Sequence, residues 1–165
     1  AASSAASGSI ALFHVKEVTP ESRRIDASTL TDAERMVVSS EDLDKIKDTL
    51  SKSEGGEDIF LGCPHLSIEE IEQVAVRLKT HPTKRKVWCF TSRVVYEEAE
   101  RRGIIDSIKS RGGEVVKDTC MVVAPLNSLK IYEAETNSCK AAIYLPSLSN
   151  INVKLAPLHK ILSTE

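Results

Sequence analysis

The sequence alternates short apolar runs with stretches in which apolar residues recur at helical spacing, and this alternation is its most constraining feature. The short runs predict strands, at residues 10–15, 35–39, 58–62, 86–91, 114–117, 120–124 and 151–155. The amphipathic stretches predict helices over residues 41–51, after Ser67, after Ser92, and over residues 104–110 and 137–145. Strands separated by helices are typical of βαβ units. The sequence therefore predicts a three-layer α/β fold, with a mostly parallel sheet and helices on both of its faces.

Composition and charge exclude several classes of protein. The 22 Lys and Arg residues nearly balance 24 Asp and Glu, so the formal net charge is −2. A nucleic-acid-binding domain usually carries a strong basic excess, so nucleic acid is not expected as a partner. The chain has no apolar run long enough to span a membrane, so no membrane partner is expected either. Its four cysteines lack any secretory context, which favours reduced thiols and a cytoplasmic location.

The start of the chain is rich in small residues and has no initiating Met. Residues 1–8 are interpreted as the end of a small-residue helix closed by Gly8. We expect residues 1–165 to form a single α/β domain that is a piece of a longer polypeptide.

In parallel sheets, chemistry gathers at the carboxyl ends of the strands, beside helix amino termini. Cys63 follows a predicted strand and precedes a capped helix, and Cys120 lies at a second interruption between apolar runs. Either thiol could ligate an iron–sulfur cluster, or each could be a half-buried structural thiol. Cys89 lies within an apolar strand and is expected in the core.

Two further residues lie where a polar turn opens a predicted helix. Lys140 could meet an anionic substrate there or be a solvated surface lysine, whereas Cys139 is expected to pack. The phosphate-binding loops of nucleotide-binding proteins are absent from the sequence.

Several motifs, taken in order, resemble the catalytic large subunit of the aconitase X family. They are Gly-Cys-Pro-His at residues 62–65, Thr-Ser-Arg at 91–93, Asp-Thr-Cys at 118–120 and Thr-Asn-Ser-x-Lys at 136–140. The resemblance covers almost the whole chain, but large subunits of this family are longer, so it implies the carboxyl-terminal part of one. Cys139 departs from the small Gly or Ala that is usual in the family, which supports a packing role.

The resemblance implies an iron–sulfur-dependent hydro-lyase. Cys63 and Cys120 match two ligands of an iron–sulfur cluster, which the resemblance implies to be [4Fe-4S] with its third cysteine outside this chain. Lys140, with Ser138 and Asn137, matches the residues that bind a small anionic substrate. The resemblance also implies a small swivelling subunit or domain as partner, and it does not identify the catalytic base.

Two activities occur in this family. The favoured one is dehydration of mevalonate 5-phosphate to an anhydromevalonate phosphate in an archaeal mevalonate pathway, and the other is dehydration of cis-3-hydroxy-L-proline. A non-catalytic domain that binds or assembles a cluster is a third hypothesis.

Overall fold

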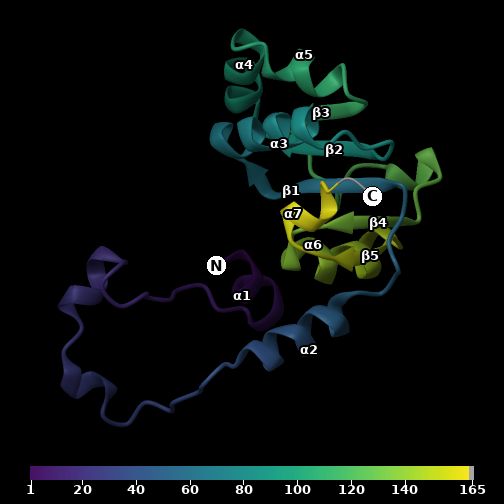
Figure 1. Ribbon diagram of the computed structural model, residues 1–165. Coiled ribbons are helices and arrows are strands. Elements are labelled where there is room, and N and C mark those ends of the chain that lie inside the picture. Colours follow the sequence, from purple (N-terminus) through teal and green to yellow (C-terminus); the bar gives the residue numbers. More distant parts are fainter. Residues whose placement is uncertain (164–165) are drawn as a thin grey trace.

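A computed structural model describes residues 1–163, and its centre is a five-stranded parallel sheet in the order β3-β2-β1-β4-β5 (Figure 1). The strands are β1 (Asp58–Leu66), β2 (Lys86–Thr91), β3 (Gly113–Lys117), β4 (Glu133–Thr136) and β5 (Asn152–Leu155). The helices are α1 (Ala2–Gly8), α2 (Ser40–Leu50), α3 (Ile68–Thr80), α4 (Arg93–Arg101), α5 (Ile104–Lys109), α6 (Cys139–Tyr144) and α7 (Leu158–Ile161). A π-helical turn over Leu145–Ser149 extends α6, and 3-10 turns lie at Pro20–Arg24, Ala27–Leu30 and Leu126–Leu129.

Helices cover both faces of the sheet, as the sequence predicts. On one face, α3, α4, α5 and α7 pack on a core that contains Ile59, Leu61 and Val87. On the other face, α6 and the segment after β3 pack on a core that contains Phe60 and Phe90. Because side chains alternate between the faces of a strand, neighbouring residues of β1 supply the two cores. The predicted α/β fold with a parallel sheet is confirmed.

Local sequence signals set the helix starts. Ser67 caps α3: its hydroxyl accepts from the Glu70 amide at 3.3 Å, while the Glu70 carboxylate accepts from the Ser67 amide at 2.8 Å. This reciprocal pair of hydrogen bonds is a capping box. Ser39 caps α2 in the same way through Asp42.

Two predicted strands at residues 10–15 and 35–39 are wrong. Both segments are irregular and exposed, and Ile10, Leu12 and Val37 face outward. A strand needs a neighbour for its backbone hydrogen bonds, and these segments run away from the sheet through the long excursion that precedes α2 (Figure 1). The apolar composition of a short run therefore did not decide its structure.

The predicted strand at residues 120–124 is also wrong, and β4 was not predicted. Residues 121–124 form a turn in which the Ala124 amide donates to the Cys120 carbonyl at 2.9 Å. In β4, Glu133 and Glu135 alternate with Ala134 and Thr136, which are buried. That alternation is the period of a strand, but it is too short and too acidic to stand out in the sequence.

The chain between α2 and β1 lies along the outer edge of β5. The Lys52 amide donates to the Val153 carbonyl at 2.8 Å, and the Leu155 amide donates to the Ser51 hydroxyl at 3.1 Å. In the part of the chain that the structure describes, no helix has the length and apolar character needed to cross a membrane.

Gly62 allows β1 to bulge at its carboxyl end. The pairing of β1 with β2 is regular up to Leu61 and resumes only at Leu66. Gly62 has a φ of 108°, and a Cβ atom built on it would lie 2.2 Å from the Phe90 carbonyl oxygen. Only glycine fits a left-handed conformation in such close contact with a neighbouring strand. The bulge projects residues 63–65 out of the strand.

We predict that Gly62→Ala lowers the free energy of unfolding by about 2 kcal/mol or more, because it combines backbone strain with a clash against β2. Thermal melting of the full-length protein measures the effect. Gly112→Ala is the matched control, since Gly112 also has a positive φ, 79°, but its added Cβ would meet nothing within 4 Å. Equal melting temperatures for the two variants would contradict the steric argument.

Candidate functional site

The candidate site lies at the carboxyl ends of β1 and β4, where the strand order changes direction. After β1 the chain builds β2 and β3 on one side, and it then returns to build β4 and β5 on the other side. In open α/β sheets, crossovers on opposite faces commonly leave a ligand-binding crevice at such a switch point. Cys63 comes from the β1 bulge, and Ser138 lies two residues after the end of β4.

Ser138 joins the two sides of this crevice. Its hydroxyl donates to the Cys63 carbonyl and accepts from the Ala141 amide at 3.0 Å, so it caps α6 while holding the bulge. The Ser138 amide in turn donates to the Thr136 hydroxyl at 3.2 Å. These contacts fix the start of α6, and with it Lys140, against the Cys63 loop.

Cys120 is positioned by a separate loop after β3. Asp118, with a φ of 60°, turns the chain out of the strand, and its carboxylate accepts from the Arg93 amide at 3.0 Å. The same carboxylate forms an ion pair with the Arg93 guanidinium. This double contact ties the Cys120 loop to the start of α4.

His65 connects the two cysteine loops. Its Nε2 lies 2.7 Å from the Thr119 carbonyl oxygen and donates to it, 54 positions along the chain. The hydrogen bond spans the end of β2, because β1 and β3 are not adjacent in the sheet. Cys63 is two residues from His65, and Cys120 is one residue from Thr119. This hydrogen bond therefore links the two segments that carry the cysteines.

Burial raises the pKa of the half-buried Cys63 thiol. The Ser138 hydroxyl and the positive charge of Lys140 lower this pKa, and Cys120 raises it. Lys140 lies two residues after Ser138, whose hydroxyl donates to the Cys63 carbonyl, and Cys120 directly follows Thr119, whose carbonyl accepts from His65. A metal ion or cluster at this position would favour the thiolate, as does the lysine.

The structure thus brings together four of the residues singled out in the sequence: Cys63, Cys120, Ser138 and Lys140. Asn137, in the same turn, is exposed. Cys139 is half-buried against the core that contains Phe60, in keeping with a packing role, and Cys89 is fully buried in the other core as predicted. Within residues 1–163, no three His, Cys, Asp or Glu side chains are grouped so that they could hold a metal ion.

The residues that hold the two loops were not assigned roles from the sequence. Arg93 and Asp118 belong to motifs noted there, but their pairing joins positions that are distant in the chain. The Ser138 hydroxyl, which the resemblance assigns to substrate binding, donates to the Cys63 carbonyl and accepts from the Ala141 amide of α6. A polar residue before a helix is a capping signal, which was available in the sequence.

Comparison with protein families gives two matches. A family model described as the aconitase X third domain matches residues 57–165, and one described as the aconitase X second domain matches residues 1–48. The first of these segments contains the whole sheet and every residue of the candidate site.

Named relatives are similar over most of the chain. The phosphomevalonate dehydratase large subunit of Methanocaldococcus jannaschii is 36% identical over 162 residues, which are 98% of this chain and 40% of that protein. The cis-3-hydroxy-L-proline dehydratase of Hypocrea jecorina is 32% identical over 152 residues, 84% of this chain and 25% of that protein. The chain therefore spans less than half the length of these relatives.

A solved structure has the same fold. The crystal structure of Thermococcus kodakaraensis aconitase X in its holo-form superimposes with a TM-score of 0.84 at 29% identity, covering 98% of this chain and 41% of that one. The agreement extends over nearly all of the chain.

We predict that Cys89 resists alkylation in the folded protein, because burial raises its pKa to about 12 and no water reaches it. Iodoacetamide near pH 8, where an ordinary thiol is partly ionised, should label half-buried Cys63 and Cys120 in cluster-free protein but not Cys89. Mass spectrometry of the digested protein identifies the labelled sites, and denaturant should expose Cys89. Equal labelling of all of them in the native state would contradict the burial of Cys89.

Proposed function

Because the chain belongs to the aconitase X family, we propose that it is the part of an iron–sulfur-dependent dehydratase large subunit that carries two cluster ligands and a substrate-binding lysine. The observation that supports this most directly is the convergence of Cys63, Cys120 and Lys140 at one crevice, joined by the hydrogen bonds of Ser138 and His65. Family members are named as dehydratases in the comparisons above.

The residues present fit part of an iron–sulfur site. Cys63 and Cys120 supply two half-buried thiols on linked loops, and thiolates are the usual ligands of such clusters. Three-cysteine ligation, which leaves one iron open, needs a further thiol, and we place it in the rest of the subunit. When bound, a [4Fe-4S] cluster would supply a Lewis acid that eases departure of the substrate's hydroxyl group.

The chain's own residues would orient the substrate. Lys140 brings a positive charge to the crevice beside Cys63, where its ammonium group can donate hydrogen bonds to a carboxylate or phosphate of the substrate. The half-burial of Lys140 strengthens such a contact relative to a fully solvated lysine. The exposed Asn137 side chain is free to add a hydrogen bond from the same turn, while Ser138 holds the turn in place.

We propose mevalonate 5-phosphate as the substrate, giving an anhydromevalonate phosphate in a mevalonate pathway. Its support is the similarity over 98% of the chain to a protein named for that activity. Dehydration of cis-3-hydroxy-L-proline is the second candidate, supported by the relative of that name. The name "large subunit" supports a separate small subunit as partner, and we place the enzyme in the cytoplasm.

We predict that Cys63→Ser and Cys120→Ser each abolish cluster absorbance and dehydratase activity in the full-length enzyme, because removing a thiolate leaves the cluster short of a ligand. Iron content and the visible spectrum after anaerobic reconstitution with the small subunit are the measurements. Cys89→Ser, by contrast, should mainly lower the melting temperature, since it places a hydroxyl in a packed core. Normal iron content in both of the first two variants would overturn the ligand assignment.

We predict that Lys140→Ala lowers kcat/KM by on the order of ten- to a hundred-fold while the cluster remains in place, because a charge-assisted contact with the substrate is lost. Activity on mevalonate 5-phosphate and on cis-3-hydroxy-L-proline should be measured side by side, since the preferred substrate identifies the reaction. Lys130→Ala is the matched control, because Lys130 is exposed beyond the 3-10 turn at Leu126–Leu129. Unchanged kinetics of Lys140→Ala on both substrates would show that Lys140 is a solvated surface lysine that does not bind substrate.

A further inference from the structure

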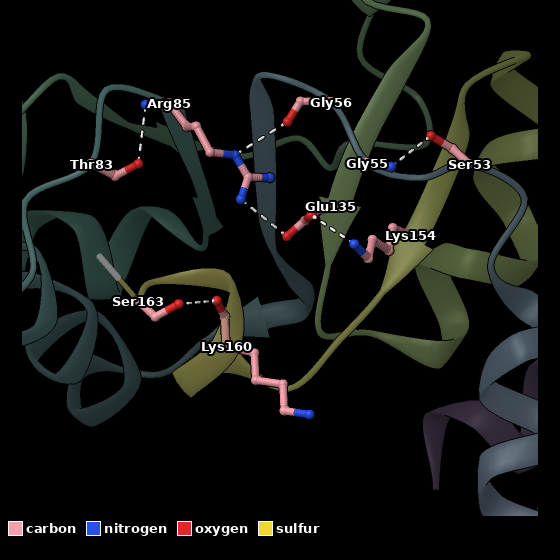
Figure 2. Close-up of polar contacts among 9 residues, drawn as sticks. All are labelled: Ser53, Gly55, Gly56, Thr83, Arg85, Glu135, Lys154, Lys160 and Ser163. Atoms are coloured by element: carbon pink, nitrogen blue, oxygen red, sulfur yellow. Dashed lines mark hydrogen bonds and ion pairs between the residues drawn. The ribbon is translucent and has the colours of Figure 1, made fainter. Parts of the chain in front are cut away.

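A second polar cavity lies away from the crevice, beside α7 and the amino ends of β1 and β2. Its volume is about 500 Å³, and its lining includes Lys84, Arg85, Glu135, Lys154 and Lys160. Arg85 directly precedes β2, whereas Cys63 lies in the bulge near the carboxyl end of β1. Figure 2 shows Arg85, Glu135 and Lys154 linked in a chain of polar contacts, with Lys160 on α7 nearby. None of these residues belongs to the proposed dehydratase site.

Arg85 is held rigidly but incompletely satisfied. Its Nε donates to the Gly56 carbonyl at 3.2 Å, and its Nη1 donates to Glu135 Oε2 at 3.1 Å (Figure 2). Its Nη2 is buried and has no hydrogen-bond acceptor among residues 1–163. Solvent does not reach this atom, so Arg85 acts on the cavity through its positive charge rather than through this N–H group.

The charges around the cavity are unbalanced. Four cationic side chains (Lys84, Arg85, Lys154 and Lys160) line it, and within the described part of the chain Glu135 is the one carboxylate among its lining residues. Glu135 is shared, because its Oε1 also lies 3.9 Å from Lys154 Nζ. A single carboxylate therefore faces two cations directly, and the surplus positive charge favours an anion in the cavity.

We propose that this cavity binds the phosphate group of a small molecule. Lys84, Lys154 and Lys160 supply ammonium donors that suit a multiply charged oxyanion, and the Arg85 guanidinium adds a further positive charge. The volume exceeds that of a phosphate ion and lies in the range of small-molecule sites. The ligand is thus a phosphomonoester or free phosphate, bound at the end of the sheet opposite Cys63.

Isothermal titration calorimetry of the full-length protein with inorganic phosphate and with glycerol 3-phosphate tests the proposal. We expect saturable binding that weakens on the order of ten-fold in Lys154→Ala, because one charged contact is lost. Glu135→Gln should tighten binding instead, because it removes the competing carboxylate without changing the side chain's shape. Tighter binding of glycerol 3-phosphate than of phosphate would assign the site to phosphomonoesters, and equal binding would assign it to free phosphate.

Two controls separate this site from the dehydratase site. Lys140→Ala should leave this binding event unchanged, so that a failure of the proposed function does not affect the test. Lys109→Ala, an exposed lysine at the end of α5, should also have no effect. Absence of saturable binding, or binding that is the same in wild type, Lys154→Ala and Glu135→Gln, would overturn the proposal.

Discussion

The central position of β1 is the constraint on which the rest of the structure depends. Because β1 pairs with β2 on one side and with β4 on the other, the connections after β1 and β4 leave on opposite faces. Helix α3 packs on one core and α6 on the other, so the two helices start on opposite faces of the sheet at the switch point. At this switch point, the Ser138 hydroxyl after β4 donates a hydrogen bond to the Cys63 carbonyl of β1. The candidate site is in this sense a consequence of strand order rather than of any single motif.

Much of the sheet could be predicted from sequence, because its strong signals are local. The apolar runs of β1 and β2 and the capping box of α3 each lie within one segment. The contacts that build the site are not local: Ser138 and Cys63 are 75 positions apart, and the periodicity of either segment says nothing about the other. The same limit explains the errors before α2, where apolar residues were present but no neighbouring strand was. The positions of Cys63 and Cys120 at strand ends followed from a general rule of parallel sheets.

The two ends of the sheet differ in chemistry. At the carboxyl ends, thiols and a lysine stand on loops that are held by hydrogen bonds to backbone atoms. At the amino ends, an arginine and a glutamate bridge the loop before β2 and the strand β4, across the start of β1. The strands run between these two regions, with an apolar core on each face of the sheet. Substitutions at one end can therefore change its chemistry while the core between them keeps the strands in register.

The segment that follows α2 also determines how this sheet can meet other chains. An open edge strand has unpaired amides and carbonyls that can hydrogen-bond to a strand of another chain. Such pairing is a common cause of aggregation. At β5 that opportunity is removed, because Lys52 and Ser51 already occupy backbone groups of Val153 and Leu155. Growth of the sheet by strand addition is thereby directed to β3, at the far edge. Any protein that approaches from the β5 side has to recognise side chains instead of backbone, which makes association there selective by sequence.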